Sequence, residues 1–361
     1  MKDKVKKIIK SPVFTLLLVV SLTGLVLWLT LRNDFDEVVG ILRNADVGIL
    51  LLVAGLMVLD RVIHGWGLMQ ECHVSHKDYK MSQGFVNSYT GSLFNNITPS
   101  ASGGQFAQLF IFTRQGIPAS AAVGVLWLDF IIYQTTMSLF VAVLLLLRFG
   151  YYYSHYSQFF LIVLFGFAVN SAVIVALWAM VKFPKFYRWL STTGIHFAYK
   201  FRIIKDEEDM RHKMSEQLSR FEDEIVILKE HKKMICMVAL SNLLRLIIYY
   251  SVPFFCAWAL HIHIGPELWL DTVALSSFVA MVNAFVPLPG SSGGTEATFV
   301  LMFSTILSHV NASSVMIVWR VMTYYFQTIM GGLVFLYGRT RPSVSVVEPI
   351  NKVVGNGENI L

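Results

Sequence analysis

Two short segments rich in glycine, serine and proline interrupt apolar stretches of this sequence and could bind an anion. The first is Asn96–Gly104 and the second is Asn283–Glu296. Serine hydroxyl groups and unpaired backbone N–H groups at such a break can donate to a phosphate. A helix that begins there adds the partial positive charge of its N-terminus. Arg320, flanked by apolar residues on both sides, could add a full charge. These residues predict a phosphate-binding site.

The candidate binding residues come from both segments and from the apolar stretches that follow them. Those of the first half are Asn96, Pro99, Ser100, Ser102, Gly103, Gly104, Asp129 and Gln134. Those of the second half are Pro287, Pro289, Gly290, Ser292, Gly293, Gly294, Glu296 and Arg320. Arg61 and Arg245 are secondary candidates for the phosphate. Glu296, in the first turn of a helix, could bind a cationic group, carry a proton or cap that helix.

Each of these polar residues also has a purely structural interpretation. A charge in the middle of a bilayer is costly, so it should face a partner or a water-filled cavity. Asp129 could therefore pair with Arg320 without any ligand. The amides that could line the same cavity, or hydrogen-bond one helix to another, are Asn95, Asn96, Asn283, Gln134 and Gln327. The sequence leaves both alternatives open.

The elements that must position these residues are membrane helices. The 361 residues are 55% hydrophobic and only 14% charged, with a mean hydropathy of +0.59, which is typical of an integral membrane protein. A span of the hydrocarbon core needs about 20 helical residues. Six stretches are long enough: Val13–Leu31, Val47–Trp66, Pro118–Leu147, Phe159–Val181, Met234–His261 and Ser313–Tyr337.

The placement of basic residues predicts the orientation. Lysines and arginines concentrate before the first span, between the fourth and fifth, and after the last, whereas Gly150–Gln158 and His261–Leu268 contain none. The positive-inside rule then puts both termini and the central loop in the cytoplasm. The net charge of +6 therefore reflects membrane orientation, and no nucleic-acid partner is expected.

The number of spans between the two breaks predicts an inverted repeat. The basic link Glu71–Lys80 before the first break should be cytoplasmic, and three full spans follow that break. If each broken segment forms a hairpin that enters and leaves on one side, the second must enter from outside, as in many carriers. The expected fold is an all-α integral membrane protein with about six full transmembrane helices plus two re-entrant helical hairpins. The polytopic domain would cover 1–340, with hairpins at about 82–116 and 269–307, a cytoplasmic amphipathic loop at about 183–233 and a disordered tail at 341–361.

Known catalytic signatures are missing from the sequence. It has no glycine-rich phosphate loop ending in Lys-Ser/Thr, no His-Glu-x-x-His and no Gly-x-Ser-x-Gly. Cys72, Cys236 and Cys256 form no Cys-x-x-Cys pair, so neither a metal site nor a disulfide framework is expected. A transporter without a cofactor fits this pattern better than an enzyme.

At the two broken segments the chain resembles the flippase-like transmembrane region of lysylphosphatidylglycerol synthases. The residues that carry the resemblance are Asn96, Pro99, Ser100, Gly103, Gly104, Gly116 and Asp129, then Pro287, Pro289, Gly290, Gly293, Gly294, Glu296 and Arg320. The resemblance implies a lipid translocator that moves aminoacylated phosphatidylglycerol to the outer leaflet. In full-length members this confers resistance to cationic antimicrobial peptides. Those members also carry a cytoplasmic aminoacyl-transferase domain, which is not expected here.

The resulting hypothesis is a lipid flippase of the bacterial inner membrane that moves an anionic or aminoacylated phospholipid, such as lysyl-phosphatidylglycerol. Its partners would be the membrane phospholipid and a separate lipid-modifying synthase, and a homodimer is left open. Two alternatives remain: the membrane part of a phosphatidylglycerol lysyltransferase system, and a carrier for a small solute.

Overall fold

The computed structural model describes residues 35–99, 101–147, 157–182, 230–283, 291 and 293–340. The predicted first span, the tail 341–361 and nearly all of the predicted amphipathic loop lie outside these residues. Within the described ranges every regular element is a helix. The α-helices are α3 (Phe35–Arg43), α4 (Val47–Cys72), α5 (Met81–Ile97), α6 (Gly104–Arg114), α7 (Ala119–Leu147), α9 (Ser157–Lys182), α12 (Lys232–Ala259), α13 (Trp269–Asn283), α14 (Gly294–Phe303), α15 (His309–Arg320) and α16 (Gln327–Thr340). A 3-10 turn, η1 (Pro266–Leu268), precedes α13, and a π-helical segment, η2 (Val321–Phe326), joins α15 to α16.

Among the described residues, three helices are long and apolar enough to cross a membrane: α4, α7 and α12. The predicted fourth span corresponds to α9, which has 26 residues. The predicted sixth span corresponds to α15, η2 and α16, which follow one another without a gap. The outer surface carries large exposed apolar side chains, for example Leu51, Phe106 and Leu146. Such a surface suits lipid rather than water. The chain is thus an all-helical membrane protein, while six spans remain a prediction.

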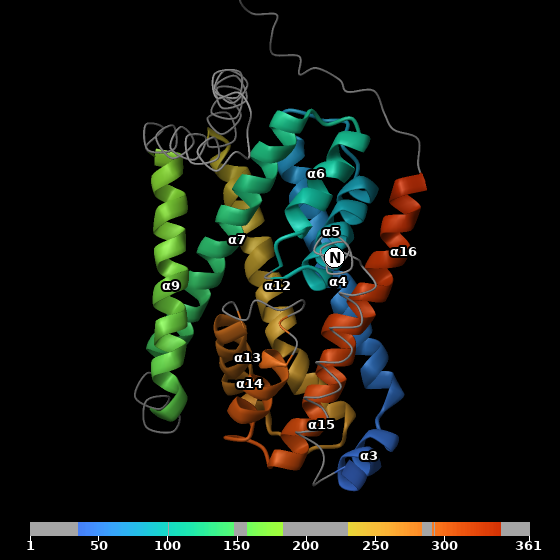
Figure 1. The fold of residues 1–361 in the computed structure, drawn as a ribbon, viewed down its shortest axis with the longest axis vertical. Coiled ribbons are helices and arrows are strands. Elements are labelled where there is room, and N and C mark those ends of the chain that lie inside the picture. Colours follow the sequence, from blue (N-terminus) through green and yellow to red (C-terminus); the bar gives the residue numbers. More distant parts are fainter. Residues whose placement is uncertain are drawn as a thin grey trace, which may run out of the picture.

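Each of the two breaks separates a pair of helices that pack on each other, α5 with α6 and α13 with α14. We refer to these pairs as the first and second hairpin, and their re-entrant insertion in the membrane stays a prediction. In the first, α5 ends at Ile97 and α6 begins at Gly104; in the second, α13 ends at Asn283 and α14 begins at Gly294. Figure 1 shows α5 and α6 in the upper half of the molecule, and α13 and α14 in the lower half. The hairpins therefore lie toward opposite ends of the long axis.

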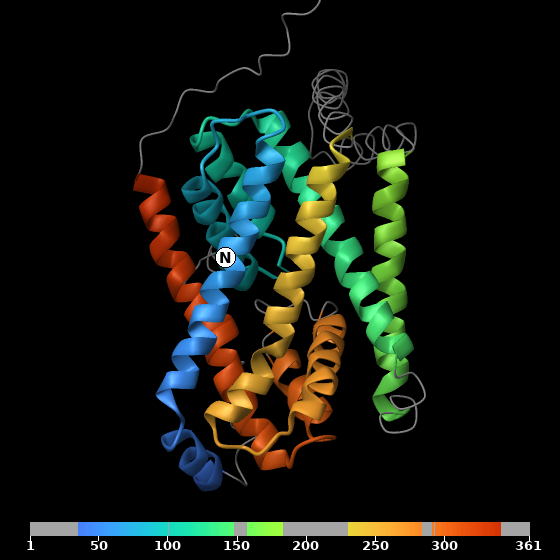
Figure 2. The same ribbon diagram turned by 180° about the vertical axis from the view of Figure 1, so that it is seen from behind.

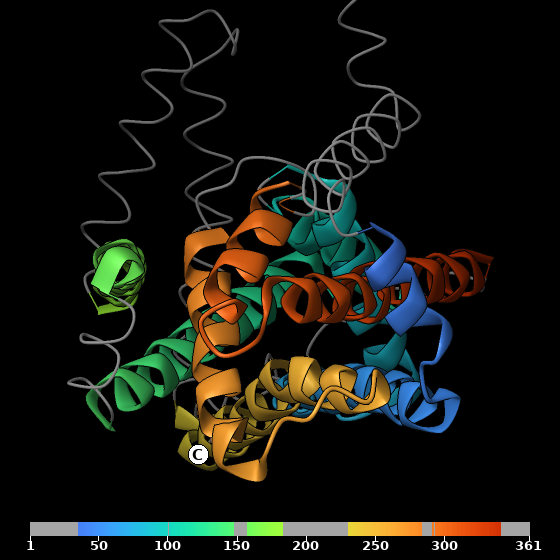
Figure 3. The same ribbon diagram turned by 90° about the horizontal axis from the view of Figure 1, so that it is seen from below.

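Long helices hold the two hairpins in place. α4 and α12 run side by side along most of the long axis of the molecule (Figure 2). Seen along the long axis, α7, α12, α13 and the α15–α16 helix surround the centre, with α9 at the edge (Figure 3). Asp46 caps α4, since its Oδ1 accepts from the backbone N–H groups of Gly48 at 2.7 Å and Ile49 at 3.1 Å.

Close packing fixes each hairpin against this scaffold. α5 crosses α4 where Gly65 and Gly84 meet; a Cβ on Gly65 would lie 2.7 Å from the backbone nitrogen of Phe85. α14 packs on α15 where the ring of Phe299 stacks on that of Trp319, with centroids 4.7 Å apart. Within α14, the ring of Phe303 stacks on that of Phe299 at 4.0 Å. Both contacts exclude substantial movement of the hairpins without repacking.

Candidate functional site

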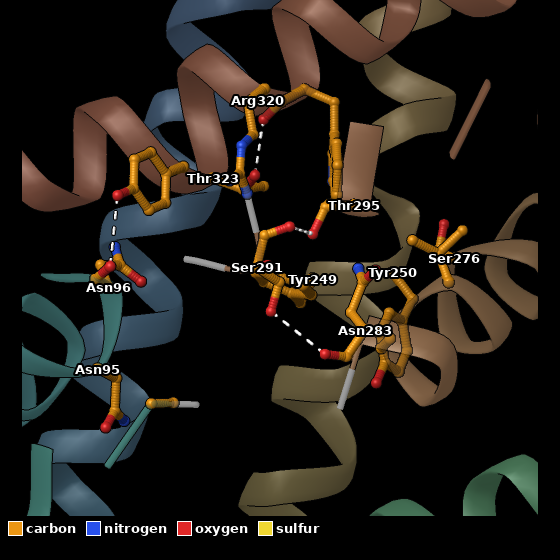
Figure 4. Close-up of a pocket in the computed structure, with 15 residues that line it drawn as sticks. Asn95, Asn96, Tyr249, Tyr250, Ser276, Asn283, Ser291, Thr295, Arg320 and Thr323 are labelled. Atoms are coloured by element: carbon orange, nitrogen blue, oxygen red, sulfur yellow. Dashed lines mark hydrogen bonds between the residues drawn. The ribbon is translucent and has the colours of Figure 1, made fainter. Parts of the chain in front are cut away.

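A cavity of about 300 Å³ lies between the two hairpins. The tip of the first hairpin, the second hairpin, α12 and the α15–η2 helix all contribute to its walls, as Figure 4 shows for the labelled residues. Segments that are far apart in the sequence therefore meet at one polar site. The lining residues are Asn95, Asn96, Ala101, Tyr249, Tyr250, Ser276, Val279, Ala280, Asn283, Ser291, Thr295, Trp319, Arg320, Thr323 and Tyr324.

A buried ion pair joins the second hairpin to the last long helix at this cavity. Arg320 Nε lies 2.8 Å from Glu296 Oε1, and Glu296 is fully buried. The Arg320 guanidinium also lies over the ring of Tyr324, 4.2 Å from its centroid. The structural alternative that pairs Arg320 with Asp129 is therefore wrong. Glu296 supplies the counter-charge, so the pair as a whole is neutral.

The start of α14 is shaped by the same glutamate. Gly293 has a φ of 88°, a conformation that glycine adopts at little cost. Its N–H donates to Glu296 Oε2 at 2.7 Å, which is the capping interaction expected of a glutamate three residues into a helix. The sequence allowed Glu296 to bind a cationic group, carry a proton or cap the helix. The cap is present, and the other carboxylate oxygen of Glu296 pairs with Arg320.

At the start of α6 the chain's own side chains bind the backbone donors. Asn95 Oδ1 accepts from the N–H of Gly104 at 3.0 Å, and Thr98 Oγ1 accepts from the N–H of Gly103 at 2.8 Å. The prediction that these donors hold a phosphate is corrected here, because they already have partners. The same correction applies to the N–H of Gly293. Among the described residues, the full positive charge at the cavity wall is that of Arg320.

The first hairpin is tied to the last long helix beside the cavity. Tyr324 donates its hydroxyl proton to the backbone oxygen of Asn96 at 3.3 Å, and Asn96 Nδ2 donates to Thr328 Oγ1 at 3.0 Å. Asn96 thus both lines the cavity and connects helices. Both roles that the sequence allows for Asn96, lining the cavity and hydrogen-bonding one helix to another, are therefore present.

Several predicted candidates of the two breaks do not reach the cavity wall. Ser102 is exposed, and its hydroxyl donates to the backbone oxygen of Pro99 at 2.9 Å within the turn. In the second break the lining serine is Ser291, which donates to Asn283 O at 3.2 Å. Gly294 begins α14 without lining the cavity. The candidates outside the described residues are Ser100, Pro287, Pro289, Gly290 and Ser292.

Arg61 and Arg245 form a separate buried cluster around Asp60. Arg245 Nε donates to Asp60 Oδ1 at 3.0 Å, and Arg61 Nε donates to Asp60 Oδ2 at 2.7 Å. A second Arg245 nitrogen donates to Asn242 Oδ1 at 2.7 Å. Neither arginine lines the cavity. The cluster nevertheless lies near it, because Arg245 is one helical turn from Tyr249 on α12 and Tyr249 is in the cavity wall.

Asp129 and Gln134 on α7 also face away from the cavity. Asp129 Oδ2 lies 3.2 Å from His64 Nε2, and Gln134 Nε2 donates to Asn170 Oδ1 on α9 at 3.1 Å. Gln327 likewise donates to the backbone oxygen of Met57 at 3.0 Å. These amides hold helices together, which is the second of the two interpretations that the sequence left open.

Sequence reasoning missed much of the aromatic wall. Thr323 and Tyr324 follow Arg320 by three and four positions, a spacing that places side chains on one helix face and could have pointed to them. Tyr249 and Tyr250 on α12 offer no comparable local pattern. Their role depends on how α12 packs against the hairpins.

The site shows no arrangement for a metal: the part of the chain that the structure describes contains no group of three or more His, Cys, Asp or Glu side chains suited to hold one. In comparison with known proteins, the sequence model of one family, described as the lysylphosphatidylglycerol synthase TM region, matches residues 14–331. No curated protein matches the chain.

Proposed function

Because this chain belongs to the family of the lysylphosphatidylglycerol synthase TM region, we propose that it is a lipid translocase. It would move the headgroup of an anionic or aminoacylated phospholipid, such as lysyl-phosphatidylglycerol, across the bacterial inner membrane. The observation that carries this proposal is the cavity between the two hairpins, with the buried Arg320 in its wall.

The proposed membrane arrangement has six full spans and two re-entrant hairpins that enter from opposite faces, with both termini in the cytoplasm. Non-helical backbone at membrane depth requires cover by protein or a water-filled cavity. The breaks after Ile97 and Asn283 both adjoin the cavity, because Asn95, Asn96 and Asn283 line it. This position supports the re-entrant interpretation, as does the pairing of broken segments in two halves.

The size of the cavity supports a headgroup as its ligand. A volume of about 300 Å³ is at the lower end of ligand sites. It suits a polar headgroup, while two acyl chains would have to remain in the bilayer outside. Arg320 would attract the phosphate, since a guanidinium matches phosphate geometry and charge. Asparagine, serine, threonine and tyrosine side chains in the wall would exchange hydrogen bonds with the rest of the headgroup.

The charge balance of the wall favours reversible binding. Glu296 neutralises Arg320, so a phosphate that enters must share the guanidinium with that carboxylate. Such competition weakens binding, and a carrier must release its cargo. The cluster of Asp60, Arg61 and Arg245 carries one net positive charge, and Arg245 is one turn of α12 from Tyr249 in the wall. This charge would strengthen the attraction for the headgroup phosphate.

The proposal is tested by headgroup translocation in proteoliposomes with labelled phosphatidylglycerol and lysyl-phosphatidylglycerol. The Arg320→Ala variant should lose most of the protein-dependent rate, because no other described residue supplies a full positive charge at the cavity wall. Arg43→Ala, at the exposed end of α3, is the matched control and should keep the wild-type rate. If the purified protein moves neither lipid, the translocase proposal is wrong. Lysylated lipid made in a host that expresses this chain alone would instead favour the transferase system.

A further inference from the structure

Glu71 is a fully buried acid with no partner for either carboxylate oxygen among the described residues. It lies near the end of α4, beside buried Leu68 and Cys72. An ionised carboxylate without donors is very costly in such a site, whereas the neutral acid costs far less. Glu71 is therefore expected to hold a proton. The proposed headgroup site gives it no role.

Glu71 belongs to a line of ionisable side chains on one face of α4. Asp60, His64 and Glu71 are spaced by four and seven residues, which places them above one another along the helix. Asp60 reaches the charged cluster beside the cavity, as described above. Glu71 is the last residue but one of α4, next to the link to α5. The line thus runs from one end of the molecule to its middle.

Asp129 on α7 is a neighbour of both Glu71 and His64. Its charge acts on Glu71, and its Oδ2 lies 3.2 Å from His64 Nε2. Its other oxygen, Oδ1, is buried and accepts no hydrogen bond from the described residues. His64 Nδ1 lies 2.9 Å from Ser88 Oγ on α5, so both imidazole nitrogens have a polar neighbour. An imidazole held between two such groups can gain a proton from the carboxyl side and return it there.

Charged and titratable side chains on the surrounding helices face Glu71, His64 and the neighbouring Arg61. Glu71 is faced by Asp129 from α7 and by Cys72 on its own helix. The groups that face His64 are Arg61 on α4, Ser88 on α5, Asp129 on α7 and Arg245 on α12.

Tyr89 on α5 and Tyr133 on α7 face Arg61. Tyr79, in the link beyond α4, is buried, and burial raises its pKa well above the usual value, so it stays neutral.

We propose that Glu71 and Asp129 form a proton-binding site, linked through His64 to the charges beside the cavity, and that a proton gradient acts on translocation through it. This inference rests on the proposed function. In each step one O–H or N–H bond breaks and another forms. Glu71 gives its proton to the Asp129 carboxylate, and Asp129 gives it to His64 Nε2, which becomes an imidazolium with Ser88 Oγ 2.9 Å from its Nδ1. The proton leaves by the same steps in reverse, so every transfer has a named donor and acceptor. No electrons are exchanged.

Protonation of His64 links this site to the headgroup. An imidazolium beside Arg61 and Arg245 adds a further positive charge to their cluster. Arg245 is one helical turn from Tyr249 in the cavity wall, so a further positive charge on this cluster raises the positive potential there. An anionic headgroup then binds more tightly, and by reciprocity the bound headgroup favours uptake of the proton.

The test compares translocation in sodium-free proteoliposomes with and without an imposed pH gradient. We expect the gradient to raise the wild-type rate about fivefold or more, the lower range of coupling between two sites. Glu71→Gln, which mimics the neutral acid, should keep the rate without a gradient and lose this increase. Asp78→Asn, exposed in the link after α4, is the matched control and should respond like the wild type. A full response in Glu71→Gln, or a response to a sodium gradient instead, would overturn the proton site.

A second readout separates this inference from the proposed function. Infrared difference spectra over a pH titration should show the band of a protonated carboxylic acid in the wild type, reduced in Glu71→Gln and unchanged in Asp78→Asn. This signal needs no translocation. If the band is unchanged in Glu71→Gln, the proton site is wrong even when lipid is moved. If no lipid moves while the band behaves as expected, the translocase proposal fails alone.

Discussion

Glu296 combines two interactions at one carboxylate: Oε2 accepts from the N–H of Gly293, and Oε1 pairs with Arg320. The first interaction fixes the start of α14, and the second attaches α14 to α15. Because Glu296 is fully buried, water cannot replace either partner. The residue therefore connects the geometry of the second hairpin to the charge of the cavity.

These two interactions can be separated by substitution. Glu296→Gln keeps an acceptor for Gly293 but removes the charge that Arg320 needs, so we expect a loss of about 3 kcal/mol or more in the free energy of unfolding. Glu296→Ala should lose about 1 kcal/mol more, because the cap goes as well. Thermal unfolding in detergent measures both. In the double variant Glu296→Gln with Arg320→Gln, the loss should be smaller than the sum of the single losses. Additive losses would show that the pair is not coupled.

The cluster of Asp60 with Arg61 and Arg245 shows the limit of sequence reasoning at this scale. All three charges stand out in apolar stretches, and the need for partners follows from their cost in a membrane. The identity of the partners does not follow. Asp60 and Arg245 come from helices far apart in the chain, and only the packing of α4 on α12 brings them within 3.0 Å.

At the scale of elements, the boundaries of both hairpins were predictable, whereas their contacts were not. Proline and glycine cannot continue a helix without cost, so α5 ends at Ile97, just before Thr98-Pro99, and α13 ends at Asn283. The π-helical segment Val321–Phe326 gave no sequence signal. It starts directly after Arg320 and carries Tyr324, and such segments are frequent at functional sites.

The contact of α16 with the first hairpin makes an element-scale prediction. A Cβ on Gly331 would lie 2.9 Å from Leu93 Cβ and 3.2 Å from the backbone oxygen of Tyr89, whereas a Cβ on Gly332 meets nothing within 4 Å. Gly331→Ala should therefore cost about 1–3 kcal/mol, as overpacking does. Gly332→Ala, its neighbour on the same helix, should be neutral or slightly stabilising, since alanine favours helix. Thermal unfolding of both variants measures this difference. If the two substitutions changed the stability equally, the close contact between α16 and α5 would not contribute to it.

At the scale of the whole molecule, the cavity joins the two halves of the chain. Its wall takes Asn95, Asn96 and Ala101 from the first hairpin and Asn283, Ser291 and Thr295 from the second. The sequence indicated that the two breaks belong together, because their composition is alike. That they meet at one cavity depends on the long helices between them, whose packing no single sequence reveals.

The opposed hairpins make a final prediction about orientation in the membrane. The link between α4 and α5 lies at the opposite end of the molecule from the turn between α12 and α13 (Figures 1 and 2). Lys77 in the link and His263 in the turn are both exposed. In a Cys236→Ser background, we expect a membrane-impermeant thiol reagent to label Lys77→Cys only from the cytoplasmic side and His263→Cys only from outside, as the positive-inside rule requires. Cys72 and Cys256 are buried and should stay unlabelled. Labelling of both sites from one side would mean that the hairpins do not enter from opposite faces, and the inverted repeat would be wrong.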